Sequence, residues 1–134
     1  MGIYKDTEQV YNVLGSTWRK AFSEESIASK FKAMGIYVHF IVHDPEGEMW
    51  LMPDATVHEG PWDGTPDKPV VTMEMKTDVA HEFWMDRLNV PVATARGQIK
   101  ARGPVAKIFG LLPVVKPAKV FYPEIAKQYG VDVK

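Results

Sequence analysis

Residues 36–52 read IYVHFIVHDPEGEMWLM, and this stretch decides the fold class. Apolar side chains stand at every second position of its first half, at Ile36, Val38, Phe40 and Val42. This period of two is typical of a β-strand with one buried face. The turn residues Pro45-Glu46-Gly47 separate it from a second strand over 48–52. The sequence therefore predicts a β-hairpin over 36–52.

Helical patterns precede the hairpin. Asp6 or Thr7 is a good N-cap for a first helix. The apolar positions that follow have helical spacing, at Val10, Leu14, Trp18 and Ala21. A second helix is predicted from Ser23 to Met34, with Gly35 as its stop.

Strands and helices alternate after the hairpin. A short strand is predicted over 55–59, and the Gly- and Pro-rich residues 60–69 predict a loop. Further strands are predicted over 70–76 and 97–102. Between them Thr77 or Asp78 starts a helix whose apolar positions include Val79, Ala80, Phe83, Trp84 and Leu88. After the last strand, Gly103-Pro104 starts a helix, and the helical C-terminal segment is interrupted by Pro113, Pro117 and Pro123.

These elements predict an α+β fold. Adjacent strands with short connections favour a five-stranded antiparallel sheet, and the helices are expected to cover one of its faces. A chain of 134 residues favours a single domain over 1–134.

Composition excludes several classes of function. The chain has no cysteine, which excludes disulfides, thiolate catalysis and cysteine-rich zinc sites. Its formal net charge of −1 gives no support to a nucleic-acid partner. No apolar stretch reaches the ~18 residues of a membrane span, and the first residues lack an apolar signal core. We therefore expect a cytoplasmic location.

The polar residues predict no catalytic or metal site. His39 and His43 lie on one face of a strand but about 13 Å apart, too far to share a metal ion. His81-Glu82 begins like a zinc-protease motif, but Met85 stands where the second histidine belongs. Lys100 and Arg102, with Arg96 and Lys107 nearby, form a basic edge. Its usual interpretation is the polar face of a strand, and the alternative is contact with an anionic lipid head group or membrane surface.

Residues 68–125 resemble the sterol carrier protein 2 (SCP2-like) family. The resemblance begins with a strand and helix at 68–85 (KPVVTMEMK, then TDVAHEFWM). It continues through Leu88-Asn89 and Ala93 to the strand GQIKARG at 97–103. It closes with a helix over 105–112, the segment LPVVKP at 112–117, and Tyr122. The Gly-x-Ile-x-x-x-Gly strand between two helices is the most specific element. One departure is Asp86, which stands where the family often has glycine.

The resemblance implies an apolar tunnel between a five-stranded antiparallel sheet and its helices. It implies non-covalent binding and transfer of sterol-like molecules, fatty acids, acyl-CoA or phospholipids, without catalytic residues or a cofactor. As partners we expect this lipid, transient membrane contact and no nucleic acid, with the protein a monomer or weak homodimer. The residues expected to contact lipid come from the mid-chain helix, one strand and the C-terminal helices: Phe83, Trp84, Leu88, Ile99, Ile108, Phe109, Leu112, Val115 and Phe121.

Two alternatives stay open. A small isomerase- or hydratase-like enzyme also binds an apolar substrate, but it needs a buried acid–base residue, for which Asp54, Asp78 and Tyr122 are the candidates. An accessory domain that dimerises or presents a substrate to an enzyme would use exposed aromatic side chains. The candidates for that role are Trp50, Trp62 and Tyr129.

Overall fold

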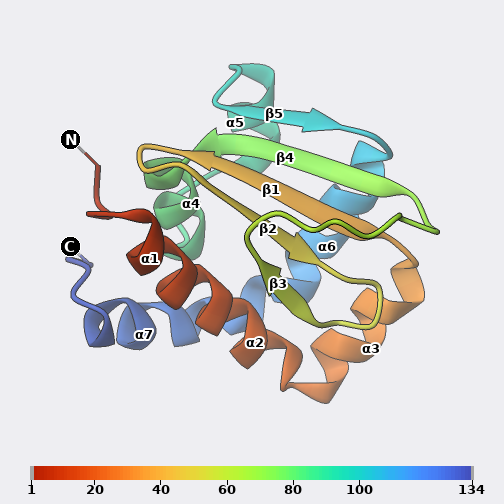
Figure 1. The fold of residues 1–134 in the computed structure, drawn as a ribbon, viewed down its shortest axis with the longest axis horizontal. Coiled ribbons are helices and arrows are strands. Elements are labelled where there is room, and N and C mark those ends of the chain that lie inside the picture. Colours follow the sequence, from red (N-terminus) through yellow and green to blue (C-terminus); the bar gives the residue numbers. More distant parts are fainter. Residues whose placement is uncertain (1, 134) are drawn as a thin grey trace.

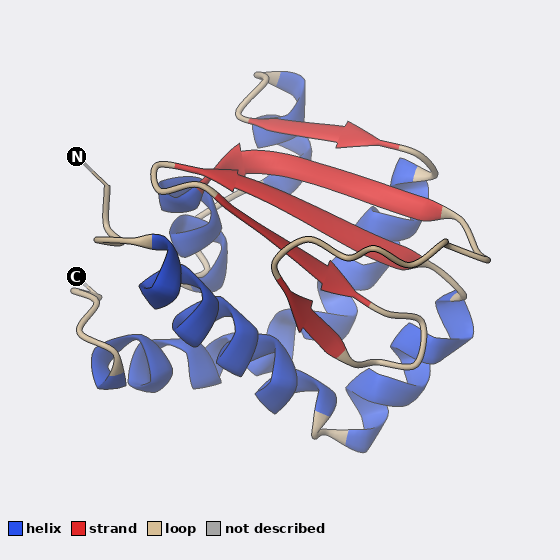
Figure 2. Ribbon diagram, viewed as in Figure 1, coloured by secondary structure: helices blue, strands red, loops and turns tan. Residues whose placement is uncertain are grey.

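The computed structural model describes residues 2–133 and contains a five-stranded sheet with helices below and behind it in the view of Figures 1 and 2. The strand order is β3-β2-β1-β4-β5. The strands are β1 (Tyr37–His43), β2 (Gly47–Leu51), β3 (Val57–Glu59), β4 (Val70–Lys76) and β5 (Ile99–Arg102). This architecture confirms the α+β class and the predicted hairpin.

The sheet is mixed, which the prediction of an antiparallel sheet did not include. Three of its strand pairs are antiparallel, whereas β1 pairs with β4 in parallel, with Phe40 opposite Met73. The cause is the segment 60–69, which carries the chain from edge strand β3 across to the far side of β1. Adjacent position in the sequence therefore did not mean adjacent position in the sheet.

The helices come in three groups along the chain. The first group is α1 (Thr7–Val10), the π-helical turn η1 (Tyr11–Gly15), α2 (Ser16–Phe22) and α3 (Glu25–Met34). Between β4 and β5 lie α4 (Thr77–Trp84) and α5 (Val90–Ala95). The chain ends with α6 (Val105–Val115), the 3-10 helix η2 (Lys116–Phe121) and α7 (Tyr122–Gln128). The predicted cap of the first helix is present, because the Asp6 carboxylate accepts a hydrogen bond from the Gln9 amide at 2.8 Å.

The two faces of the sheet differ in their cover. The inner face carries the alternating apolar residues of the strands, such as Val38, Val71 and Ile99, which pack against the helices. On the outer face, the crossover segment folds back over the sheet. There the Trp62 ring lies 5.3 Å from Tyr37 and 5.2 Å from Trp50, measured between centroids. The crossover segment thus covers part of the face that has no helix.

The region after α4 differs from the sequence prediction. Met85 ends α4, and Asp86 follows in the left-handed conformation with φ 61°. A residue in the left-handed conformation directly after the last helical turn ends the helix, and glycine is the residue that adopts this conformation without strain. Leu88 therefore lies beyond α4 instead of inside it. A short additional helix, α5, then follows its N-cap Asn89, whose side chain accepts a hydrogen bond from the Val92 amide at 3.1 Å.

Backbone conformation explains both glycines of the GQIKARG strand. Gly97 has φ 80° and Gly103 has φ 92°, which disfavours side chains at either end of β5. At Gly103 a Cβ atom would also stand 2.2 Å from the Val70 carbonyl oxygen. The second glycine therefore allows the chain to leave β5 directly beside β4.

A buried chain of polar side chains joins the N-terminal segment, α4 and α7. The Tyr4 and Tyr122 hydroxyls lie 2.6 Å apart, and the Tyr122 hydroxyl lies 2.5 Å from His81 Nδ1. All three side chains are buried, and Tyr122 is completely inaccessible to solvent. Burial raises the pKa of Tyr122 to about 12 and lowers the pKa of His81 below its ordinary value. We infer that this network ties together the two ends of the chain, which lie on the same side of the molecule in Figure 1.

Tyr122→Phe is expected to destabilise the protein by about 1–3 kcal/mol, because Tyr4 and His81 each lose a buried hydrogen-bond partner. Urea denaturation followed by circular dichroism measures the change. Tyr129→Phe is the matched control, since Tyr129 is exposed, and its effect should stay within about 0.5 kcal/mol. Equal effects of the two substitutions would contradict a stabilising role for the network.

His81 makes stability depend on pH. Its folded-state pKa lies below its unfolded value of about 6.5, so the unfolded chain binds more protons, and stability falls as the pH drops from about 6.5 toward the folded-state pKa. Relative to His81→Gln, the wild type should therefore lose unfolding free energy between about pH 7 and 5. His43 has a pKa raised by Glu74 and Glu46, but it is common to both proteins and cancels in the difference. Parallel pH profiles would show that His81 does not titrate in this way.

Candidate functional site

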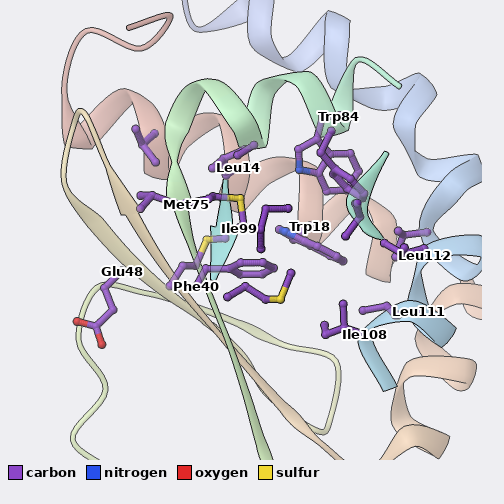
Figure 3. A pocket seen from close by; sticks show the side chains of 18 of the residues that line it. Leu14, Trp18, Phe40, Glu48, Met75, Trp84, Ile99, Ile108, Leu111 and Leu112 are labelled. Carbon is purple, nitrogen blue, oxygen red and sulfur yellow. The ribbon is translucent and has the colours of Figure 1, made fainter. Parts of the chain in front are cut away.

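An apolar cavity of about 70 Å³ lies between the sheet and the helices. Five strand residues whose side chains point inward form its floor: Phe40, Val42, Met73, Met75 and Ile99, joined by Met49 of β2. The helices form its walls and roof with Val10, Tyr11, Leu14, Trp18, Ala80, Phe83, Trp84, Val90, Ile108, Leu111, Leu112 and Val115. Figure 3 shows these side chains converging from both layers.

The only charged residue in the lining is Glu48, and its carboxylate is not directed into the cavity. Figure 3 shows it at one end, pointing away from the apolar side chains. One of its carboxylate oxygens lies 2.6 Å from His39 Nε2. Tyr11, beside it, accepts a hydrogen bond at its hydroxyl from the Glu48 amide at 3.1 Å. The interior therefore offers a ligand apolar contact and aromatic edges, without a charge to recognise a polar group.

Aromatic rings form the centre of the lining. The Trp18 ring meets the Trp84 ring edge-on at 5.1 Å between centroids, and it lies 5.9 Å from the Phe40 ring. Such pairs are attractive beyond the area they bury. They fix where helix α2, helix α4 and the sheet meet, and so they set the position of the cavity.

The cavity is smaller than the 300–1,000 Å³ typical of ligand sites. A long alkyl chain requires it to expand. Met49, Met73 and Met75 supply flexible side chains that can change rotamer inside the floor. The partly exposed lining residues Phe83 and Leu112 show where the cavity approaches solvent on the helical side.

Six of the nine residues expected to contact lipid line this cavity: Phe83, Trp84, Ile99, Ile108, Leu112 and Val115. Three lie outside the lining. Phe109 is 39% exposed because α6 packs with Ile108, Leu111 and Val115 buried, which leaves Phe109 on the outer side of the helix. Phe121 lies in η2 with its ring 5.4 Å from Lys20 Nζ, and Leu88 lies beyond the end of α4.

Sequence reasoning did not assign the N-terminal helix to the site. Val10, Leu14 and Trp18 line the cavity together with the inward methionines of β4. The sequence shows the helical spacing of Val10, Leu14 and Trp18 and the period of two of the methionines. Only the packing of η1 and α2 against the sheet, however, brings them to the same cavity.

The acid–base candidates of the enzyme alternative do not gather at the cavity. Asp54 is exposed, and the half-buried Asp78 accepts a hydrogen bond from the Ile3 amide at 2.8 Å. Tyr122 is buried, as such an enzyme would require, but it belongs to the His81 network and does not line the cavity. Within residues 2–133, no group of three or more histidine, aspartate or glutamate side chains is placed to hold a metal ion.

The aromatic residues expected to be exposed are only partly so. Trp50 is 9% exposed, and its ring stacks on His39 with 4.1 Å between centroids, which corrects the expectation for this residue. Trp62 is half-buried against Tyr37 and Trp50, and Tyr129 alone is exposed. In residues 2–133, no helix has both the length and the apolar character needed to span a bilayer.

Comparison with known proteins bears on the fold. No protein-family model matches the sequence, and no curated protein matches it significantly. Among solved structures, sterol carrier protein 2 from Yarrowia lipolytica in its apo form is 14% identical, with a TM-score of 0.65 over 89% of this chain and 98% of that one. The sterol carrier protein domain 2 of Helicoverpa armigera is 19% identical, with a TM-score of 0.59 over 89% of each chain.

A third match is to part of an enzyme. The inverting sec-alkylsulfatase Pisa1 from Pseudomonas sp. is 17% identical over 65% of this chain, with a TM-score of 0.53, and the matched part is 14% of that enzyme. The two carrier-protein structures, by contrast, match along nearly their full lengths. The chain therefore has the fold of sterol carrier protein 2.

Proposed function

We propose that this protein binds a lipid non-covalently in the cavity between its sheet and its helices, and that it carries this lipid without chemical change. The observation that carries the proposal is the lining: apolar side chains from both layers surround a space that they do not fill. Protein cores normally leave few voids larger than a water molecule. The fold shared with sterol carrier proteins supports the same proposal.

The lining indicates the class of ligand. An unbranched acyl chain or a sterol ring system has only apolar surface to bury, which suits a cavity without an inward-directed charge. A fatty acid or acyl-CoA would keep its polar head group outside the cavity. We therefore propose sterol-like molecules, fatty acids or acyl-CoA as the ligands.

The expected affinity is modest. Burying about fifteen CH₂ groups contributes roughly 12 kcal/mol. Association costs an estimated 4–15 kcal/mol, so about 8 kcal/mol remains at the low end of that cost. This corresponds to a Kd of about 1 μM. Expansion of the small cavity adds to the cost, and binding of this strength allows the lipid to be released again.

A titration of the delipidated protein with a bromine-labelled fatty acid tests the proposal. Bromine quenches tryptophan emission at short range, and Trp18 and Trp84 line the cavity. We expect saturable quenching in the micromolar range that an unlabelled fatty acid reverses. Absence of saturable quenching would exclude binding of this ligand in the cavity.

The double variant Trp50→Phe/Trp62→Phe locates the bound ligand, because these two tryptophans lie in contact on the outer face of the sheet. The variant should retain all of the quenching seen in the wild type. Loss of the quenching in this variant would place the ligand on the outer face instead.

Ala80→Leu is expected to lower ligand affinity about tenfold or more, because the larger side chain occupies space that the ligand needs. The protein should remain as stable as the wild type, since the substitution fills a void. Ala33→Leu on the exposed surface of α3 is the matched control and should leave affinity unchanged. An unchanged affinity in Ala80→Leu would mean that ligand binds elsewhere.

The match to part of Pisa1 favours one second candidate, a domain that presents an apolar substrate to an enzyme. Binding in the cavity is common to both candidates. They differ in the fate of the lipid, which mass spectrometry of lipid extracted from the purified protein can follow. An unmodified cellular lipid supports carriage, whereas a reaction intermediate supports presentation to an enzyme.

A further inference from the structure

Basic residues are concentrated in one segment of the chain. Residues 87–123 contain seven lysine and arginine residues and no aspartate or glutamate, although the whole chain has a formal net charge of −1. The segment comprises α5, the edge strand β5, α6 and η2. Such a charge asymmetry indicates an anionic partner.

Acidic residues outside the segment pair with three of these seven cations. Arg87 pairs with Glu82 at 2.6 Å, Arg102 with Glu74 at 3.5 Å, and Lys119 with Asp86 at 3.0 Å. The other four, which are Arg96, Lys100, Lys107 and Lys116, form no ion pair with residues 2–133. The segment therefore keeps a positive charge after its neighbours are counted.

The outward surface of α6 is apolar. Lys107 is the only charged or hydrogen-bonding side chain in the helix, which reads VAKIFGLLPVV. We define its outer stripe as the exposed residues Ala106, Phe109, Gly110, Pro113 and Pro117, the last at the start of η2. Phe109 is 39% exposed, and Val120 in η2, which shares a surface hollow with Pro113, is 71% exposed.

Two lysines flank this stripe, one near each end of α6. Lys107 lies next to Ala106 near the start of the helix, and Lys116 lies next to Pro117 at its end. Both are exposed, and Lys107 Nζ donates only to the Met34 carbonyl oxygen, at 2.9 Å. An apolar stripe flanked by lysines is the pattern of helices that lie in the interface of an anionic bilayer.

We propose that the outer stripe of α6, with Lys107 and Lys116, docks the protein on the surface of an anionic lipid bilayer. The lysines would meet lipid phosphates and carboxylates while Phe109 enters the boundary between head groups and acyl chains. A second copy of this chain fits the surface less well, because a two-fold interface would bring the lysines of both copies together. Nucleic acid also fits less well, because the stripe offers its bases and phosphates no hydrogen-bond donors between the two lysines.

The opposite side of α6 faces the cavity. Ile108, Leu111 and Val115 of the same helix line the cavity, so α6 separates the proposed bilayer surface from the proposed ligand. Gly110 weakens the helix, and Pro113 lacks the amide that would bond the Phe109 carbonyl. Docking itself needs no ligand, but the passage of lipid past α6 rests on the proposed function.

Flotation with vesicles tests the docking. The wild type should bind vesicles of phosphatidylcholine with phosphatidylserine, should bind pure phosphatidylcholine far more weakly, and should dissociate as salt is raised. Lys107→Gln/Lys116→Gln should lower the partition coefficient about thirtyfold, because each lysine near an anionic surface contributes about fivefold. Phe109→Ser should lower it about tenfold.

The control surface is the polar hollow at the N-terminal side, which contains Ile3, Lys5 and Lys76. Ile3, Lys5 and Lys76 are exposed like the residues of the outer stripe, and the N-terminal segment lies across the molecule from α6 in Figure 1. Lys5→Gln/Lys76→Gln and Ile3→Ser should bind vesicles like the wild type. If these controls lose as much binding as the α6 variants, or if the wild type binds an oligonucleotide but no vesicles, the proposal is overturned.

Titration with the bromine-labelled fatty acid, without vesicles, separates this proposal from the proposed function. Lys107→Gln/Lys116→Gln should bind the fatty acid as tightly as the wild type while losing vesicle binding. Loss of both with an unchanged melting temperature would overturn the assignment of α6 as a docking surface separate from the ligand site. A wild type that binds vesicles but no fatty acid would exclude fatty acid as the ligand of the proposed function and leave the docking in place.

Discussion

The apolar inner face of the sheet is the constraint on which the rest of the structure depends. Strands β1 and β4 lie at its centre and direct Val38, Phe40, Val71 and Met73 to the same side. Contact of these apolar side chains with water would cost free energy, so this side must be covered. Helices from both ends of the chain cover this face. The Tyr4–Tyr122–His81 network then joins the N-terminal segment to α7 and α4.

That cover is incomplete, and the cavity is the result. Trp18 and Trp84 meet edge-on and hold α2 and α4 in place, while thioethers and small side chains such as Ala80 leave space beside them. A filled core would add stability, since voids forfeit contacts. A protein that must exchange a bulky apolar ligand benefits from leaving this space and from lining it with side chains that change rotamer. Under the proposed function, the free energy of ligand binding and the stability of the fold therefore depend on the same lining side chains.

The polar groups nearest the cavity are directed away from it. Glu48 turns outward to His39, and Tyr122 is used within the buried network. The helix α6 departs from the usual arrangement, because a surface helix normally has one polar face. Its inner residues line the cavity and its outer stripe faces solvent, so this helix is apolar on both its buried and its exposed side.

Most of the elements could be predicted from local patterns, because the period of two over 36–42 and 70–76 and the helical spacing of Val10, Leu14 and Trp18 are properties of short stretches of the chain. The alternation also predicted which side chains of each strand share a face, and Ile99 points from the sheet toward the helices. The parallel pairing of β1 with β4 was decided by tertiary structure, since nothing local specifies where a crossover of ten residues leads. The same holds for the outward turn of Phe109 and for the place of the first helix in the cavity. Those depend on how whole elements pack against the sheet, and that packing is a sum of many weak contacts between residues distant in sequence.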